Sequence, residues 1–150
     1  MFSLCYVGSN CQDGWTVYRN KCFRYFDSPK TWINSELYCQ NLGGHLAIIG
    51  DESEEQVVRS LITHDHDHDL DDDSRSWVWI GLHDQNQEDV FVWVDGSPIS
   101  YENWNPRQPD NVYNGYHNAT ENCVLIDDHK EGWNDYPCMH LDSYLCEISY

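Results

Sequence analysis

The sequence predicts an α+β domain, because helical patterns occupy the first half of the chain and strand-like segments occupy the second half. Two segments, near residues 32–42 and 52–63, carry the apolar spacing of helices. Beyond residue 77, short segments such as WVWIGL, FVWVDG, CVLI and SYLCEIS are rich in β-branched and aromatic residues, which favour strands. The 150 residues are enough for one domain with its own core.

The first half of the chain contains the signals that begin and end both helices. The segment GWTVYRNKCFRYF should form strands, and DSPKTW should turn the chain into the first helix. The pair Gly43-Gly44 should end that helix, and HLAIIG should follow as a short strand. Asp51 and Glu54 form a capping pair for the second helix, which should end near Thr63. The expected apolar face of the first helix comprises Trp32, Leu37, Tyr38, Cys39 and Leu42, and that of the second comprises Val57, Val58, Leu61 and Ile62.

Two stretches between these elements should be loops. Residues 64–73 read HDHDHDLDDD, and Leu70 is the one aliphatic residue before the next strand. Alternate histidines of an extended chain point the same way and would bind zinc, copper or nickel in preference to calcium. We interpret the run as a solvated loop with weak, adventitious metal binding. Residues 95–122 contain Asn, Gly and Pro throughout, and a loop of this length inside a compact domain is usually functional.

The charge of the chain excludes some classes of partner. Acidic residues number 26 against 8 basic ones, for a formal net charge of -18. Such a surface repels nucleic acid and anionic membranes, and it attracts divalent cations. No apolar run approaches the roughly 20 residues that a bilayer span requires.

The cysteines indicate disulfides and an oxidising compartment. There are seven, and none has the C-x-x-C spacing of zinc ribbons or redox motifs. The odd count leaves one thiol, which could bridge two chains. The start, MFSLCYVGSN, lacks the charged and apolar regions of a signal peptide, so we expect the mature form of a secreted, extracellular protein.

Several short motifs follow one another in the order of a known family. WIGL begins at Trp79, and it is followed by FVWVDG, QPDN, ENC, WND and a terminal YLCE. This pattern resembles the C-type lectin domain over roughly residues 11–148. The resemblance implies an α+β fold with two helices, two small antiparallel sheets and a long loop that binds calcium and sugar. Residues 1–10 would be an N-terminal extension, and residues 11–150 would be the carbohydrate-recognition domain.

The resemblance also implies a disulfide pattern. The pairs would be Cys39–Cys146 and Cys123–Cys138, with Cys11–Cys22 as the further bridge of the long form of the domain. Cys5 is left over, and some secreted invertebrate lectins of the family dimerise through such an N-terminal cysteine. We therefore expect a disulfide-linked homodimer.

The family's principal calcium site would fall on residues from separate loops, each of which supplies an oxygen. Calcium takes about 6–8 oxygen ligands at about 2.3–2.6 Å. A cis peptide before Pro109 would turn the flanking side chains towards one point. A second site, found in some relatives, would have two asparagines where acids are common and should bind calcium more weakly. The principal site would comprise Gln108, Asp110, Glu121, Asn134 and Asp135, and the second would comprise Asp84, Glu88, Asn111 and Asn122 with Glu121 shared.

Sugar binding would use the coordination positions of calcium that the protein leaves open. The protons of two neighbouring hydroxyls would face carboxylates, and their lone pairs would face amide NH2 groups. Family members with Q-P-D favour galactose and N-acetylgalactosamine, through the 3- and 4-hydroxyls, whereas those with E-P-N favour mannose-type sugars. A stacking tryptophan of galactose binders is replaced here by Val112, and we expect Tyr113 to take its place. The sugar contacts would come from Gln108, Asp110, Glu121, Asn134 and Tyr113, which implies glycan recognition in innate immunity or agglutination.

Other interpretations of these features stay open. The same fold could have mannose-type or broader specificity, or could bind ice or a protein, as some relatives do. No nucleophile motif, phosphate loop or H-E-x-x-H is present, so we do not expect an enzyme. Asn118 begins a glycosylation sequon inside the long loop, where a glycan could crowd the site or be lacking.

Overall fold

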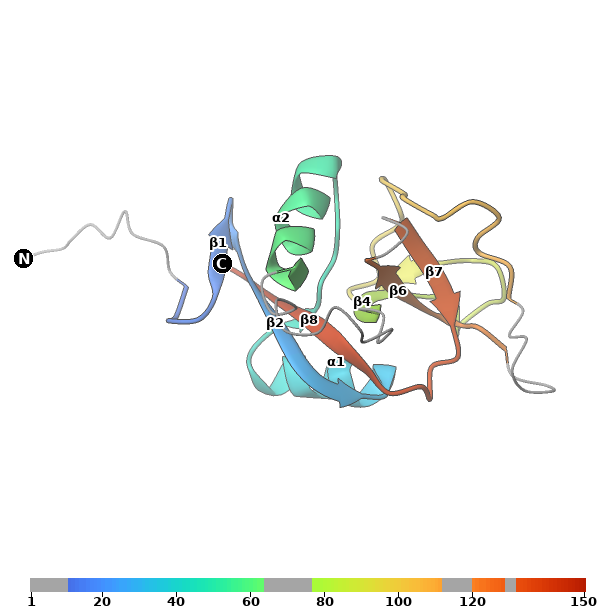
Figure 1. Cartoon of the computed structure of the whole chain (residues 1–150), viewed down its shortest axis with the longest axis horizontal. Coiled ribbons are helices and arrows are strands. Elements are labelled where there is room, and N and C mark those ends of the chain that lie inside the picture. Colours follow the sequence, from blue (N-terminus) through green and yellow to red (C-terminus); the bar gives the residue numbers. More distant parts are fainter. Residues whose placement is uncertain (1–10, 64–76, 112–119, 129–131) are drawn as a thin grey trace, which may run out of the picture.

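A computed structural model of the chain describes residues 11–63, 77–111, 120–128 and 132–150 (Figure 1). The predictions for Cys5, the 64–73 run, Tyr113 and Asn118 lie outside these residues. Within them, the α+β class is confirmed. Helices α1 (Trp32–Asn41) and α2 (Glu52–Thr63) accompany strands β1 (Thr16–Tyr18), β2 (Lys21–Lys30), β3 (His45–Leu46), β4 (Trp77–His83), β5 (Val92–Trp93), β6 (Cys123–Asp127), β7 (Gly132–Tyr136) and β8 (Asp142–Ser149).

The strands form one connected mixed sheet in the order β1-β2-β8-β4-β6-β7, with β3 paired to β8 and β5 paired to β4. The pairings are antiparallel except for a short parallel contact between β4 and β8, where Val78 pairs with Ser143 and Trp79 with Tyr144. The two small antiparallel sheets that the sequence predicts are therefore the halves of one sheet. Strands β2 and β8, from opposite ends of the domain, lie side by side (Figure 1).

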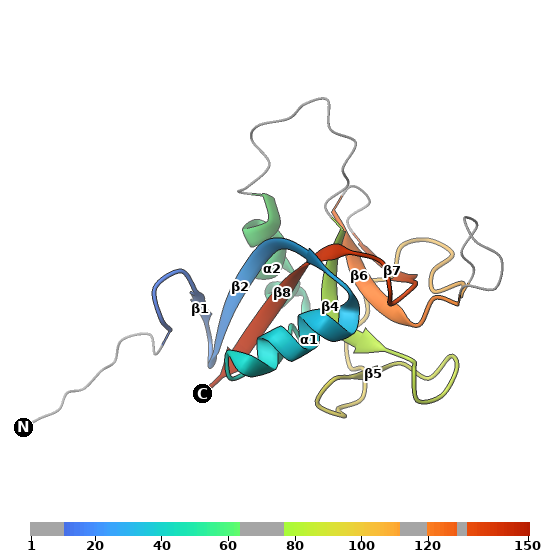
Figure 2. The same ribbon diagram turned by 90° about the horizontal axis from the view of Figure 1, so that it is seen from below.

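Both faces of the central strands are buried, and each face carries its own core. Along β4, Val78 and Ile80 pack with α2 residues such as Val58, whereas Trp79 packs with Trp32 of α1. The two helices accordingly cover opposite faces of the sheet, and Figure 2 shows α1 crossing in front of β8 and β4. Burial on both faces explains why WVWIGL and CVLI read as continuous apolar runs without alternation.

The predicted apolar face of α1 is wrong in part. Of its members, Leu37, Tyr38 and Leu42 are 48%, 38% and 39% exposed, and only Trp32 and Cys39 are buried. The helix instead buries the carboxylate of Glu36, which accepts a hydrogen bond from the backbone N–H of Leu46 at 2.8 Å. A buried acid that bonds the neighbouring strand β3 takes the place of an apolar side chain. The hydrophobic pattern of the sequence does not predict such a residue.

Most local signals elsewhere work as predicted, although HLAIIG and FVWVDG form strands only at His45–Leu46 and Val92–Trp93. Asp51 Oδ1 accepts from the backbone N–H of Glu54 at 2.8 Å, and α2 ends at Thr63. Gly43 follows α1 with φ +99°, a conformation that glycine adopts readily. The turn predicted at DSPK is wrong, because β2 continues to Lys30 through a register shift. This end of the strand lies beyond its pairing with β1, so the missing N–H of proline leaves no ladder bond unmade there.

Three disulfides close the domain: Cys11–Cys22, Cys39–Cys146 and Cys123–Cys138. These are the pairs that the family resemblance implies. The second joins α1 to β8 across 107 residues, so it ties the two ends of the domain together.

Candidate functional site

The Gln-Pro-Asp turn and the Trp-Asn-Asp strand meet at the carboxylate of Asp135. The backbone N–H groups of Asp110 and Asn111 donate to its two oxygens at 3.1 and 2.7 Å. The peptide bond between Gln108 and Pro109 is cis, as expected. Asp135 is fully buried in β7, so a regular strand holds the irregular turn in place.

Four side-chain oxygens converge where these two segments meet. The amide oxygen of Gln108 lies 2.7 Å from Asn134 Oδ1, 2.8 Å from Asp135 Oδ1 and 3.3 Å from Asp110 Oδ1. Acceptor oxygens repel one another at such distances unless a cation lies among them. A half-turn of the Gln108 amide would instead let its NH2 group donate to the same three atoms. Oxygens bound to one calcium ion, each about 2.3–2.6 Å from it, are themselves about 3 Å apart, so the spacing fits a hard cation.

Glu121 lies on the other side of these oxygens. It is 3% exposed, and carboxylate oxygens of Asp110, Glu121 and Asp135 lie within 4.8 Å of one another. Asn111 Oδ1 accepts from the backbone N–H of Glu121 at 3.0 Å, which ties the turn to the segment before β6. The structure thus brings together all five residues predicted for the principal site. We call Gln108, Asp110, Glu121, Asn134 and Asp135 the principal cluster.

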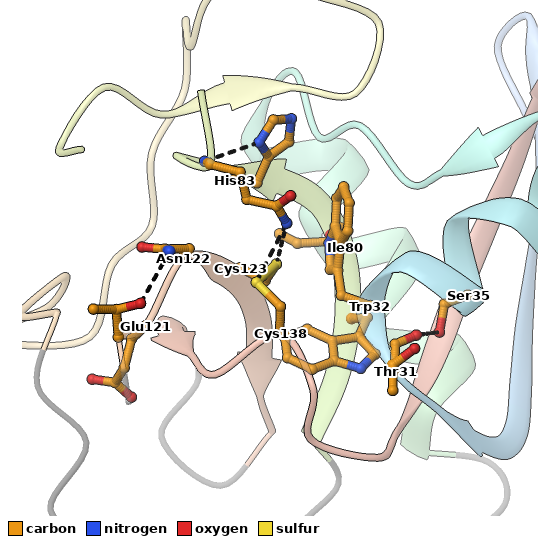
Figure 3. The surroundings of a disulfide bond; sticks show 12 residues. Thr31, Trp32, Ser35, Ile80, His83, Glu121, Asn122, Cys123 and Cys138 are labelled. Carbon is orange, nitrogen blue, oxygen red and sulfur yellow. Dashed lines mark hydrogen bonds between the residues drawn. A yellow bond between two sulfur atoms is a disulfide. The ribbon is translucent and has the colours of Figure 1, made fainter. Parts of the chain in front are cut away.

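The Cys123–Cys138 disulfide lies next to the principal cluster. It joins the start of β6 to the turn after β7, and its Cα atoms are 5.2 Å apart. Figure 3 shows Glu121 and Asn122 at the end of the segment that leads into Cys123. The covalent bond therefore links the chain segment that carries Glu121 to the strand that carries the asparagine and aspartate of the WND motif.

Burial disfavours the charged form of one carboxylate in the principal cluster. It raises the pKa of Asp135 from 3.8 to about 6, and the negative charge of Asp110 adds to the rise. The two backbone N–H donors act in the opposite direction and limit the shift. A carboxyl with this pKa is ready to exchange its proton for a metal ion near neutral pH.

A second acidic cluster follows β4. Oxygens of Asp84, Glu88 and Asp89 lie within 4.8 Å of one another. The amide oxygen of Asn122 lies 3.1 Å from Asp84 Oδ1 and 3.2 Å from Glu88 Oε2, which repeats the oxygen-to-oxygen geometry of the principal cluster. Burial raises the pKa values of Asp84 and Glu88, and the charges of neighbouring acids raise them further. We call these four residues the second cluster.

The second cluster contains three of the residues predicted for it, Asp84, Glu88 and Asn122, while the shared Glu121 is grouped with the principal cluster. Asn111 is expected there, but its side-chain oxygen accepts from the backbone of Glu121. Asp89 is a member that the motifs do not predict. Its backbone N–H donates to Asp84 Oδ2 at 2.9 Å, and its φ of +66° turns the chain back towards that carboxylate. The signal available in the sequence is the acidic pair Glu88-Asp89 directly after Gln87, but the family pattern does not single out Asp89.

Comparison with known proteins identifies the family to which the chain belongs. Residues 28–148 match the Lectin C-type domain. The chain is 37% identical over 135 residues to human versican core protein, a match that covers 89% of this chain and only 4% of that protein's length. It is 29% identical to the mouse scavenger receptor C-type lectin carbohydrate-recognition domain (TM-score 0.77, 93% and 98% of the two chains covered). It is 27% identical to herring type II antifreeze protein (TM-score 0.77, 93% and 99% covered).

Neither helix in the described part of the chain combines the length and the apolar character needed to cross a membrane. The family match spans most of the chain, and the three disulfides and the mixed sheet agree with it. The chain belongs to the C-type lectin domain family, whose members generally bind carbohydrate and are generally not enzymes.

Proposed function

We propose that this domain binds calcium at the principal cluster and, through it, a terminal galactose or N-acetylgalactosamine. The observation that carries the proposal is that the Gln108 side-chain oxygen lies 2.7 Å from Asn134 Oδ1 and 2.8 Å from Asp135 Oδ1, beside the carboxylates of Asp110 and Glu121. Three carboxylates and two amides around one point suit a hard cation in either orientation of the Gln108 amide.

Bound calcium would supply open coordination positions for two neighbouring sugar hydroxyls. The residues of the chain then have separate tasks. The carboxylates of Asp110 and Glu121 only accept, so they orient the hydroxyl protons. With their oxygens turned to the cluster, the amides of Gln108 and Asn134 present NH2 groups that donate to the hydroxyl oxygens.

The order of acid and amide around the cluster favours galactose-type sugars. Gln108 precedes the cis proline and Asp110 follows it, which is the Q-P-D arrangement of galactose-binding relatives. Tyr113 would stack on the apolar face of the sugar. Carbohydrate binding is also supported by the likeness to a scavenger receptor domain that is described as a carbohydrate-recognition domain.

The second cluster would hold a further calcium ion. Asp84, Glu88 and Asn122 supply converging oxygens, and Asp89 adds a carboxylate to the predicted set. Asn111 would contribute by holding Glu121 rather than as a ligand. Titration calorimetry should find two calcium ions per chain, and Asp84→Asn should leave one.

The setting of the activity would be extracellular. Three disulfides suit an oxidising compartment, and Cys5 would link two chains into a homodimer. Two sugar sites on one dimer raise the effective concentration of the second site, which suits agglutination and innate recognition of glycan-coated cells. A dimer band on non-reducing gels that disappears with reductant tests this point.

The rival functions keep the fold and change the ligand. Mannose-type or broad glycan specificity is the nearest one. Ice binding is favoured by the likeness to herring type II antifreeze protein, and protein binding is a third possibility. Thermal hysteresis of the solution would identify an ice binder.

A glycan array with and without calcium is the decisive experiment. Terminal galactose and N-acetylgalactosamine should be retained only with calcium, and Asp110→Ala should abolish the signal. Asp13→Ala removes an exposed acid from the other end of the domain and should bind as the parent chain does. Retention of galactose-type glycans in excess chelator, or full affinity of the Asp110→Ala chain for them, would refute the proposal. Retention of mannose alone would show the rival specificity.

A further inference from the structure

A buried carboxylate outside the principal cluster joins two of the three chain segments that form it. Glu55 lies on α2 and is 3% exposed. Its Oε1 accepts from the side chains of Arg59 at 3.0 Å, Asn103 at 2.9 Å and Trp133 at 3.1 Å, and its Oε2 accepts from the same Trp133 indole N–H at 3.0 Å. Two of these donors, Asn103 and Trp133, belong to segments 48 and 78 residues away in the sequence.

The two distant donors are also bonded to each other's backbones. The N–H of Trp133 donates to the carbonyl of Asn103 at 2.7 Å, and the N–H of Asn105 donates to the carbonyl of Trp133 at 2.9 Å. These bonds flank an isolated parallel bridge between Trp104 and Trp133. The segment around Asn103 therefore runs beside β7 as a short extra strand, and Glu55 holds both partners from one side.

Each partner leads directly into the principal cluster. Trp133 is followed at once by Asn134 and Asp135. On the other side, the carbonyl of Asn105 accepts from the backbone N–H of Gln108 at 3.0 Å, which fixes the start of the Gln-Pro-Asp turn. One carboxylate thus bonds both the segment that leads into the turn and the strand that carries Asn134 and Asp135.

From this arrangement we propose that Glu55 is a positioning residue for the calcium site, acting through Trp133 and Asn103 rather than by contact with the ion or sugar. The inference rests on the proposed function, because calcium affinity is its main readout. Ligand oxygens must be held to within about 0.5 Å to coordinate well, and the side chains that orient them determine affinity almost as strongly as the ligands do.

The carboxylate is suited to this task because its hydrogen-bond partners Arg59, Asn103 and Trp133 all donate to it. Replacing Glu55 by glutamine keeps the volume but turns one acceptor oxygen into an NH2 group. That group would face the N–H of Trp133 or Asn103, and two donors cannot bond each other. The short extra strand should then separate from β7, and the Gln108 side of the cluster should move away from Asp135.

Glu55→Gln should therefore lower calcium affinity about tenfold or more, as measured by titration calorimetry. Glu36→Gln is the matched control. Glu36 is equally buried, at 4% exposed, and its carboxylate accepts from Leu46, His45 and Gln40 on α1 and β3, away from the cluster. It should lose thermal stability to a similar extent while its calcium affinity stays within about twofold of the parent.

A metal-free readout separates this inference from the proposed function. In calcium-free protein, amide hydrogen exchange at Gln108 and Asn105 should be faster in Glu55→Gln than in the parent and unchanged in Glu36→Gln. If Glu55→Gln does not fold, Asn103→Ala removes one donor, leaves the indole bonds, and should lower calcium affinity about threefold.

The outcomes are distinct. Parent-like calcium affinity in Glu55→Gln, or an equal loss in Glu36→Gln, overturns the positioning role. A parent chain that binds no calcium refutes the proposed function alone, and the exchange rates then decide whether Glu55 positions the two segments.

Discussion

Acid should stabilise the calcium-free protein and weaken calcium binding, because the principal cluster buries a carboxylate. Burial raises the pKa of Asp135 from 3.8 to about 6 in the folded chain. Between those pH values the native state binds more protons than the unfolded state, so stability falls as the pH rises through the interval. The cost of the buried charge is fully present above about pH 6 and absent below about pH 4.

The size of the effect follows from the shift. A pKa difference of about 2 corresponds to about 3 kcal/mol, and solvent screening on the exposed side of the cluster reduces it to about 2 kcal/mol. Burial also raises the pKa values of Asp84, Asp142 and Glu147, which act in the same direction. The free energy of unfolding of the calcium-free protein should therefore rise by about 2 kcal/mol or more between about pH 7 and pH 4.5.

Calcium should reverse this profile. The ion requires ionised Asp135, so binding near pH 6 should release about half a proton from that residue, and affinity should fall below this pH. Urea denaturation followed by tryptophan fluorescence, with and without millimolar calcium, gives both stability profiles. Calorimetry in buffers of different ionisation enthalpy counts the protons. A calcium-free stability that declines from pH 7 to pH 4.5, or binding at pH 6 without proton release, would refute the reasoning.

Two further predictions concern the framework that supports the principal cluster. Replacing Cys123 and Cys138 by serine opens a loop of 15 residues and should lower the free energy of unfolding by about 3 kcal/mol, with a loss of calcium affinity that calorimetry would detect. The same change at Cys11 and Cys22, which close a loop of 11 residues far from the cluster, should reduce stability comparably and leave calcium affinity unaltered. A loss of calcium affinity in that variant would contradict the role given to the Cys123–Cys138 disulfide. Gly44→Ala would place a Cβ 1.8 Å from a backbone carbonyl oxygen of β8. Urea denaturation should therefore show a free energy of unfolding lower by about 2 kcal/mol or more. A free energy of unfolding equal to that of the parent would show that β8 can move aside without cost.

Sequence reasoning identifies the principal cluster well because its residues lie in short motifs whose order is local information. Gln108 and Asp110 flank one proline, and Asn134 and Asp135 follow one tryptophan. The fold then only has to bring these motifs together, which the buried strands β6 and β7 do. Helix α2 is likewise predicted to its last residue, since its cap and its apolar stripe are both local signals.

What the sequence does not predict is the use of buried acids. Glu36 and Glu55 look like ordinary solvent-facing residues of helices, yet each is at most 4% exposed because it accepts hydrogen bonds from partners outside its own helix. Asp89 joins the second cluster only because the chain after β4 turns back at positive φ. For Glu36 and Glu55 the deciding contacts come from other elements of the fold, whereas Asp89 contacts Asp84, five residues earlier, only because of its backbone conformation.

The two clusters also share a chain segment, because Glu121 belongs to one and Asn122 to the other. Successive side chains of an extended segment point to opposite sides, so Glu121 faces the principal cluster while Asn122 directs its oxygen to the second. The backbone of this segment is held from both sides, by Asn111 at the N–H of Glu121 and by the N–H of Asp84 at the carbonyl of Asn122. A cation in either cluster would restrain the segment that the other cluster needs, and by linkage each ion would then favour the other. Six of the 26 acidic residues therefore lie in two clusters whose charge divalent cations would offset.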